Sequence, residues 1–200
     1  LQLIAFGVIP LELILLRLVL GGSEVGPIPI LERTLIWVIA VLIPTLKFWN
    51  NPADWASLLI VRHSVKKRSA RQLKLSKLQI HPINQLGLLI GCLALFAILF
   101  VIDESAILVY PFSPLKDSSR LITLLISIPL LSIILWQWHQ LTQSIWLLTR
   151  RQELLDQTIP LTDENLMNQR TSLGLGILNL EELIPSKSIS TLPIKPQQRS

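Results

Sequence analysis

Four apolar blocks, each close to 20 residues long, dominate this sequence. The clearest covers residues 84–102 and contains no charged side chain, and a second uncharged block covers residues 121–138. A helix that rises about 1.5 Å per residue needs roughly 20 apolar residues to cross a hydrocarbon core of about 30 Å. Hydrophobic residues make up 50% of the chain and charged residues only 16%, which excludes an ordinary soluble domain and a disordered chain. The sequence therefore predicts an all-α, polytopic membrane protein.

The four blocks are expected to pair as two antiparallel transmembrane hairpins, residues 1–48 and 84–149, because only short connections separate the spans within each pair. Glycines and prolines between positions 21 and 29 form the first connection. Pro44, near the far end of the second span, removes a backbone donor, which a transmembrane helix tolerates by kinking or local repacking. The predicted spans cover residues 1–20, 30–48, 84–102 and 120–140, the last of which continues as helix to about residue 148.

The loop at residues 49–83 connects the two hairpins. Together with Lys47 at the end of the second span, it carries eight of the 18 Lys and Arg residues and one acid, Asp54. The positive-inside rule places this loop in the cytoplasm, together with both ends of the chain. Five of the six tryptophans also fall at predicted cytoplasmic ends of spans, where an indole ring sits at the headgroup level. The eight basic residues are Lys47, Arg62, Lys66, Lys67, Arg68, Arg71, Lys74 and Lys77.

Two further cytoplasmic segments are predicted. A proline suits the first turn of a helix, and Trp55, Leu58 and Leu59 recur with helical spacing, so residues 52–62 are expected to form an interfacial helix lying on the membrane. Residues 150–200 are expected to form an extended tail, which ends in a linker of Ser, Pro, Lys and Gln and has no hydrophobic core of its own.

The basic run has three interpretations that differ in partner: a solvated topology signal, contact with anionic membrane lipids, or docking of an acidic cytoplasmic protein. Each basic residue near an anionic surface contributes on the order of 1 kcal/mol, so the run is strong enough for any of them. Nucleic acid is not expected as a partner, because no aromatic residues interleave with these charges to stack on bases. The residues concerned are Arg62, Lys66, Lys67, Arg68, Arg71, Lys74 and Lys77.

Three ionisable residues of the first hairpin are candidates for a role. Glu12 lies near the middle of the first span, where an ionisable group is costly and usually has a partner or a function. It is either a proton relay or an oxygen ligand to a metal or pigment, or else a neutral or paired carboxyl that fixes helix contacts. Arg17 and Glu32 lie close to the turn of the hairpin, and their matched depth predicts that they pair as a structural clasp.

An aromatic and amide cluster, Trp136-Gln137-Trp138-His139-Gln140, lies at the predicted cytoplasmic end of the fourth span. Trp136, Trp138 and His139 can anchor the helix at the interface, or hold the edge of a tetrapyrrole or a lipid headgroup. No cofactor is required by the sequence, and chlorophyll or carotenoid is the pigment that this cluster or Glu12 would contact.

Motifs of catalysis and of metal binding are missing from the sequence. It contains no Gly-rich phosphate loop, no GxSxG, no HExxH and no clustered carboxylates. Cys92 is the only cysteine, so neither an internal disulfide nor a cysteine-based zinc site can form. We therefore expect no enzymatic activity and no metal site.

A series of short motifs carries a family resemblance. Their order resembles the cyanobacterial low-complexity tail membrane protein family, and the resemblance implies a four-span protein of cyanobacterial membranes, the thylakoid among them, without supplying an activity. The motifs are Pro-Leu-Glu-Leu at 10–13, Gly-Gly-x-x-x-Gly-Pro at 21–27, Ile-Leu-Glu at 30–32, Pro44 followed by Trp-x-x-Pro at 49–52, and Thr-Ser-Leu-Gly-Leu at 171–175.

Three functional hypotheses follow. The leading one is a non-catalytic accessory subunit that packs against other integral-membrane subunits of a larger complex and offers its basic loop and tail to cytoplasmic partners. The resemblance implies that this complex can be photosynthetic. The alternatives are a small homo-oligomeric transporter that uses Glu12, and a pigment-binding antenna or assembly factor.

Overall fold

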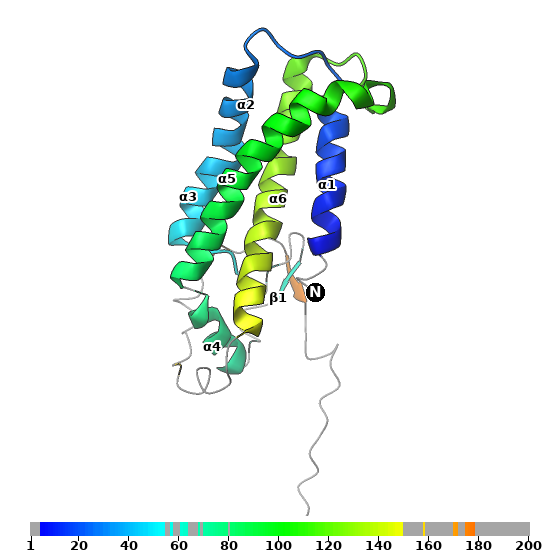
Figure 1. Ribbon diagram of the computed structural model, residues 1–200. Coiled ribbons are helices and arrows are strands. Elements are labelled where there is room, and N and C mark those ends of the chain that lie inside the picture. Colours follow the sequence, from blue (N-terminus) through cyan, green and yellow to red (C-terminus); the bar gives the residue numbers. More distant parts are fainter. Residues whose placement is uncertain are drawn as a thin grey trace, which may run out of the picture.

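The protein is a bundle of long helices (Figure 1). The computed structural model describes residues 5–149, apart from gaps at 55–56, 58–60, 64–67, 69 and 80, and also describes 158, 170–171 and 175–178. Within these residues, three helical segments are long and apolar enough to cross a membrane. They are Pro29–Asn50 with 22 residues, Pro82–Phe112 with 31 and Arg120–Leu148 with 29.

These three segments correspond to the second, third and fourth predicted spans. The first predicted span corresponds to α1 (Ala5–Leu20), whose 16 described residues lie alongside the others in the bundle (Figure 1). The segment Pro82–Phe112 consists of α5 (Pro82–Ser105) and a 3₁₀ extension, η4 (Ala106–Phe112), and is therefore longer than the predicted span. The fourth is the continuous helix α6 (Arg120–Leu148).

The span Pro29–Asn50 contains a π-helical turn next to its proline. It consists of α2 (Pro29–Trp37), the π turn η2 (Val38–Leu42) and α3 (Ile43–Asn50). Pro44 has no N–H, so the carbonyl of Ala40, four residues earlier, loses its usual helical donor. The Ser132 hydroxyl on α6 lies 2.9 Å from that carbonyl and 3.0 Å from the carbonyl of Ile128 in its own helix, and it can donate its one proton to either. A neighbouring helix can thus satisfy the backbone group that the proline leaves free, as the membrane interior requires.

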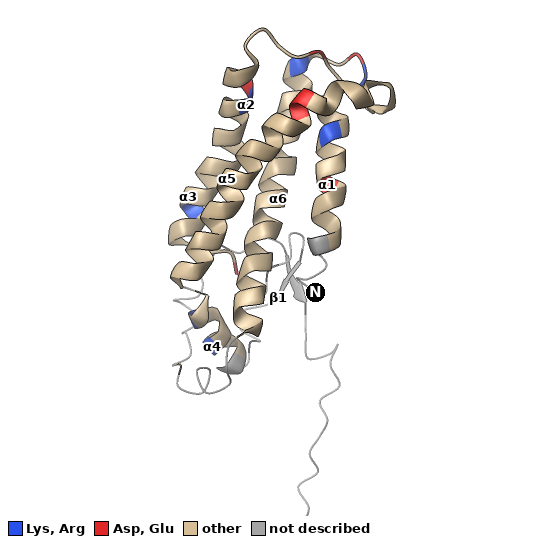
Figure 2. Cartoon of the chain, viewed as in Figure 1, with Lys and Arg blue, Asp and Glu red and all other residues tan. Residues whose placement is uncertain are grey.

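The interior of the bundle is filled by aliphatic side chains from every long helix. The outer faces are also apolar, with Leu11, Leu31, Leu93 and Leu121 each at least 59% exposed. Charged residues instead lie toward the two ends of the bundle, and the middles of the helices are almost free of them (Figure 2). This distribution matches a bundle whose sides face lipid. The most deeply buried apolar side chains include Leu16, Ala40, Leu88, Leu99, Leu131 and Leu135.

The helices of the first predicted hairpin do not pack as a pair. α1 packs against α6, α5 and η4, whereas α2 packs against α5 and α6. The turn at residues 21–28 therefore crosses the end of the bundle from one side to the other (Figure 1). α5 and α6 form the centre of the bundle and pack directly against each other.

Two short strands add a feature that the sequence did not predict. β1 (Val61–His63) pairs in parallel with β2 (Leu175–Leu178), and an isolated bridge joins Ala53 to Thr171. A segment of the tail therefore lies beside the loop that follows α3. A short helix in that loop, α4 (Ala70–Leu78), was also not predicted.

The interfacial helix predicted at residues 52–62 is wrong in its described part. Ala53 lies in a β-bridge and residues 61–63 form a strand. Ala53, Asp54 and Ser57 are all 0% exposed, so this segment is covered by protein instead of lying on a membrane surface. The tail supplies the backbone partner that favours extended structure here, since the amide of Asp54 donates to the carbonyl of Thr171 at 3.0 Å.

Candidate functional sites

An ion cluster closes the end of the bundle where α2, α5 and α6 meet. We call its members, Glu32, Arg33, Asp103 and Arg120, the Asp103 cluster. Asp103 is only 2% exposed and accepts from Arg33 Nε at 2.7 Å. Arg120 donates through its two terminal nitrogens to Asp103 at 3.0 and 2.9 Å, and through Nε to Glu32 at 2.9 Å. Two arginines and two carboxylates balance in charge, and their hydrogen bonds offset the cost of removing them from water.

The predicted clasp between Arg17 and Glu32 is wrong. Arg17 donates to the carbonyl of Ser105 at 3.1 Å, and Glu32 accepts from Arg120. The physical reason is the packing of the bundle: α1 and α2 lie on different sides of α5 and α6, so their ends meet the second hairpin instead of each other. Arg17 thereby joins α1 to the end of α5.

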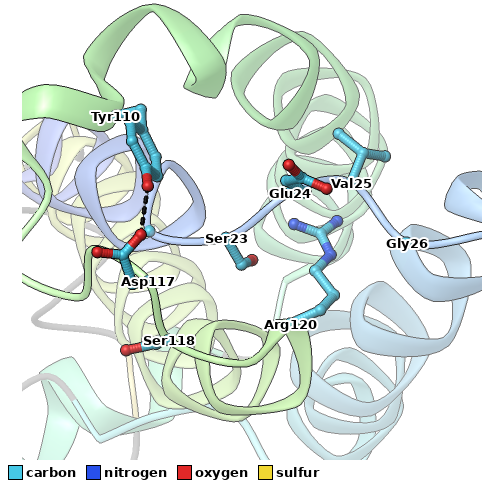
Figure 3. A pocket seen from close by; sticks show the side chains of 9 residues that line it. Ser23, Glu24, Val25, Gly26, Tyr110, Asp117, Ser118 and Arg120 are labelled. Carbon is cyan, nitrogen blue, oxygen red and sulfur yellow. Dashed lines mark hydrogen bonds between the residues drawn. The ribbon is translucent and has the colours of Figure 1, made fainter.

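A polar pocket of about 460 Å³ lies beside the Asp103 cluster. The turn at residues 22–26 forms one part of its wall, and Tyr110, Asp117 and Arg120 form another. Figure 3 shows Tyr110 donating its hydroxyl to the carboxylate of Asp117, with Glu24 and Arg120 on the other side of the opening. Among the described residues, no group of three His, Cys, Asp or Glu side chains is arranged to hold a metal ion. The pocket can accept a small polar molecule, but no ligand class is defined by its lining.

Glu12, the predicted mid-membrane acid, meets a polar partner on α6. Gln137 Nε2 donates to Glu12 Oε1 at 2.6 Å. The other carboxylate oxygen, Glu12 Oε2, and the amide oxygen of Gln137 are both buried, and neither has a hydrogen-bond partner among the described residues. The acid therefore lies in a polar pair between two helices.

The predicted aromatic cluster lies inside the bundle and not at an open interface. Trp136 is 3% exposed and His139 is 1% exposed. Trp138 donates to the carbonyl of Gly87 at 2.9 Å and lies against Gly91. A Cβ atom added at Gly91 would come within 2.2 Å of the Trp138 ring, so the absence of a side chain there lets α5 and α6 approach. Trp136 and His139 are therefore covered by protein and cannot anchor the helix as exposed side chains, whereas Trp138 is half-buried.

Hydrogen bonds define the tautomer of His139. Gln79 Nε2 donates to Gln143 Oε1 at 2.7 Å, which turns the amide nitrogen of Gln143 toward His139 Nε2, also at 2.7 Å. Nε2 of the imidazole must then be the acceptor, and the ring proton lies on Nδ1. The ring stacks on Phe48 with centroids 5.7 Å apart. The nitrogen lone pair that a tetrapyrrole metal would need is thus already engaged.

A second buried ion pair lies at the opposite end of the bundle. Arg68 and Asp54 form a two-pronged ion pair, with the arginine side chain 0% and the aspartate side chain 1% exposed. Gln140, on α6, donates to the carbonyl of Asp54 at 2.7 Å. Gln79, within the loop, donates to the carbonyl of Ala53 at 3.0 Å and to Gln143 on α6 at 2.7 Å. The loop after α3 is therefore attached to the helices by buried amides.

The tail joins the same structure. Arg170 donates to the carbonyl of Ser76 on α4, and the amide of Thr171 donates to the carbonyl of Pro52 at 3.1 Å. Thr171 Oγ1 also donates to the carbonyl of Asn51 at 2.9 Å. We call this assembly the tail-docking module; its described parts are residues 51–54, 57, 61–63, 68, 70–79, 170–171 and 175–178.

The basic residues predicted to bind a partner do not share one environment. The prediction that Arg68 contacts a partner is wrong, because Asp54, the only acid in the sequence of this loop, pairs with Arg68 in the interior. Lys77 is exposed and Lys74 is half-buried, both on α4. Lys66 and Lys67 lie outside the described residues, as do the side chains of Arg62 and Arg71.

Several residues of these sites were missed from the sequence. From the sequence, no partner was assigned to Asp103, Arg33 or Arg120. A signal was present, however, in the glutamines of the fourth span: Gln137, Gln140 and Gln143 recur every three residues in an otherwise apolar helix. Buried amides in a membrane helix require partners, so this spacing indicates contacts with polar groups of other segments.

The fold and these sites define an integral membrane bundle with a polar module at one end. The sequence matches the family described as low-complexity tail membrane protein-like over residues 1–182. The chain belongs to this family, and the predicted resemblance is confirmed. Comparisons with curated proteins and with solved structures gave no match.

Proposed function

We propose that the protein is a non-catalytic accessory subunit of a larger membrane complex, and that its tail-docking module binds an acidic cytoplasmic protein. In this proposal α1 is a fourth transmembrane span, and both ends of the chain and the module face the cytoplasm. The family resemblance supports a cyanobacterial thylakoid, and hence a photosynthetic complex, as the setting.

The observation that carries this proposal is the way in which the module is attached. Its charge pair is buried, Gln140 and Gln79 link it to the helices, and Arg170 and Thr171 bring the tail onto it. A loop that served only as a topology signal would need none of these contacts. A surface held in place on a membrane anchor costs less conformational entropy when a partner binds it.

Charge supports an acidic partner. One of the module's arginines is neutralised by Asp54, but exposed Lys77 lies on its surface, and the sequence adds Lys66 and Lys67 to the same loop. Opposite charge on a partner speeds association and aligns the two surfaces.

The proposal is tested by native purification of the tagged full-length protein in mild detergent. We expect a soluble acidic protein and integral-membrane subunits to co-purify. The combined charge reversal of Lys66, Lys67 and Lys77 to Glu should remove the soluble protein and leave the integral subunits. Lys116→Glu, an exposed reversal at the other end of the bundle, is the matched control and should remove neither. A wild-type protein that purifies alone would overturn the proposal, and chlorophyll or carotenoid absorbance in that preparation would favour the antenna alternative.

The Glu12–Gln137 pair favours a second candidate function, a small homo-oligomeric transporter. Glu12 is an ionisable group between α1 and α6, and its second oxygen meets no hydrogen-bond partner among the described residues. An intramembrane acid of this kind is the usual element of a proton or cation path. Flux assays in proteoliposomes test this function, which requires a self-oligomer and predicts loss of flux in Glu12→Gln.

A further inference from the structure

Glu12 is half-buried and faces α6, and its Oε2 atom is fully buried there. It is at the centre of α1, about 12 Å along the helix from Leu20. Its partner Gln137 is at least about 16 Å along α6 from either end of that helix. Hydrocarbon at this depth supplies no hydrogen bond and does not stabilise a bare carboxylate.

No cation compensates Glu12 among the described residues. α1 packs against α6, α5 and η4, and the charged or titratable groups on these elements are engaged elsewhere or lie at the ends. Arg17 binds the Ser105 carbonyl, His139 binds Gln143, and Glu104 is exposed at the end of α5. The remaining groups are Asp103 and Arg120 of the Asp103 cluster, Tyr110 on η4, which bonds to Asp117, and the buried thiol of Cys92 on α5, which carries no positive charge.

The Glu12–Gln137 pair has one hydrogen bond and two remaining acceptor atoms. Gln137 Nε2 donates to Glu12 Oε1 at 2.6 Å, which leaves one acceptor on each side chain, Glu12 Oε2 and Gln137 Oε1. Both atoms are buried without a partner in the part of the chain that the structure describes, and neither can donate to the other while the carboxyl group is ionised. A carboxyl group that carries a proton gains the one donor that is missing.

We propose that Glu12 is a proton-binding site and that the protonated acid and the Gln137 amide form a neutral, doubly hydrogen-bonded pair. The carboxylate takes up one proton from water, the new O–H on Oε2 donates to Gln137 Oε1, and the amide N–H continues to donate to Oε1. Both buried acceptors are then satisfied and no charge remains in the hydrocarbon. This site is independent of the accessory function proposed above and supplies the proton-binding step that the transporter alternative would need.

Infrared difference spectroscopy of the full-length protein in liposomes at neutral pH tests the proposal. A protonated carboxyl group has a C=O stretching band that a carboxylate lacks. We expect this band in the wild type, its loss in Glu12→Gln, and its retention in Glu104→Gln, the matched control at an exposed glutamate. Gln replaces the protonated acid with a side chain that has the same donor and acceptor pattern, so the variant should fold.

A second variant tests the proposal independently if Glu12→Gln alters the fold. Gln137→Leu removes the amide partner, and the C=O band of Glu12 should shift to higher wavenumber as its hydrogen bond is lost. A wild-type protein without a protonated carboxyl band would overturn the proposal. A band that survives in folded Glu12→Gln, or that does not respond to Gln137→Leu, would overturn it as well.

Discussion

Both ends of the bundle bury a charged aspartate, but its arginine partners come from different parts of the chain at each end. Each buries an aspartate against arginine: Asp103 with Arg33 and Arg120 at one end, Asp54 with Arg68 at the other. At the first end the partners all belong to the long helices, so the ion cluster closes the bundle itself. At the second end both partners belong to the loop, so the ion pair holds the tail-docking module itself together, and Gln140 and Gln143 on α6 attach it to the bundle.

The difference implies that the two ends should fail differently. Loss of the Asp103 cluster removes contacts among three helices at once and should lower the stability of the whole bundle. Loss of the Asp54–Arg68 pair should release the tail-docking module by local unfolding and leave the helices packed. Four predictions test this contrast, beginning with the largest effect.

Asp103→Asn should cause the largest loss of stability. The substitution leaves two arginines without their shared carboxylate in a mostly buried site, and breaking a buried ion pair in this way costs about 3–5 kcal/mol. Unfolding of the purified protein in detergent, followed by circular dichroism, measures the change. Glu104→Gln, at the adjacent exposed position, is the control and should change stability by less than about 0.5 kcal/mol. Equal effects of the two substitutions would show that the cluster does not hold the bundle together.

Arg68→Met should act on the module and not on the bundle. It leaves Asp54 buried without its charge partner, and we expect a local cost of about 2–3 kcal/mol. Proteolysis should then cleave the tail of the variant much faster than that of the wild type, while the thermal transition of the helices stays nearly unchanged. Lys77→Met, which removes an exposed charge from the same module, is the control. A concerted loss of helix and tail stability would contradict the contrast drawn above.

The helices could be predicted from the sequence, but most of their partners could not. Length and hydropathy are local properties, and they placed three spans within a few residues, apart from the 3₁₀ extension of the third. The ion partners of Asp103 come from positions 33 and 120, and nothing local to any of the three positions specifies which acid meets which base. The prediction that paired Arg17 with Glu32 failed because it assumed that helices adjacent in sequence are also adjacent in space.

The tail-docking module shows a second limit. β1 and β2 have three and four residues, and they pair across more than 100 positions of the chain. Such short strands carry no alternating pattern that could distinguish them from loop. Asp54 was visible as the only acid among many bases, yet the sequence did not reveal that it would select Arg68 and bury it.

Ser132→Ala measures the stability contributed by a single interhelical contact, which lies in the bundle between its two ends. It removes the hydroxyl that can donate to the Ala40 carbonyl beside Pro44, and an interhelical hydrogen bond of this kind is worth about 0.6–1.7 kcal/mol. Detergent unfolding should detect a loss in that range. Ser144→Ala is the control, because among the described residues the Ser144 hydroxyl bonds to Gln140 in its own helix, as Ser132 does to Ile128, and to no other helix. Pro44→Ala should weaken the effect of Ser132→Ala by restoring a backbone donor, and additive effects would mean that the serine does not replace the missing N–H.

Replacing Lys77 or Lys116 with cysteine should leave stability unchanged. Labelling of the two cysteines determines which side of the membrane each end of the bundle faces. Both lysines are exposed, and native Cys92 is buried in the bundle, so a membrane-impermeant thiol reagent should distinguish the two new sites. In right-side-out vesicles we expect labelling of Lys116→Cys, and labelling of Lys77→Cys only after the membrane is opened, because the excess positive charge favours the cytoplasm. Labelling of both from one side would mean that an even number of spans separates them. The segment from Pro82 to Phe112 would then not cross the membrane, and the ion-closed end and the docking end could no longer be assigned to opposite compartments.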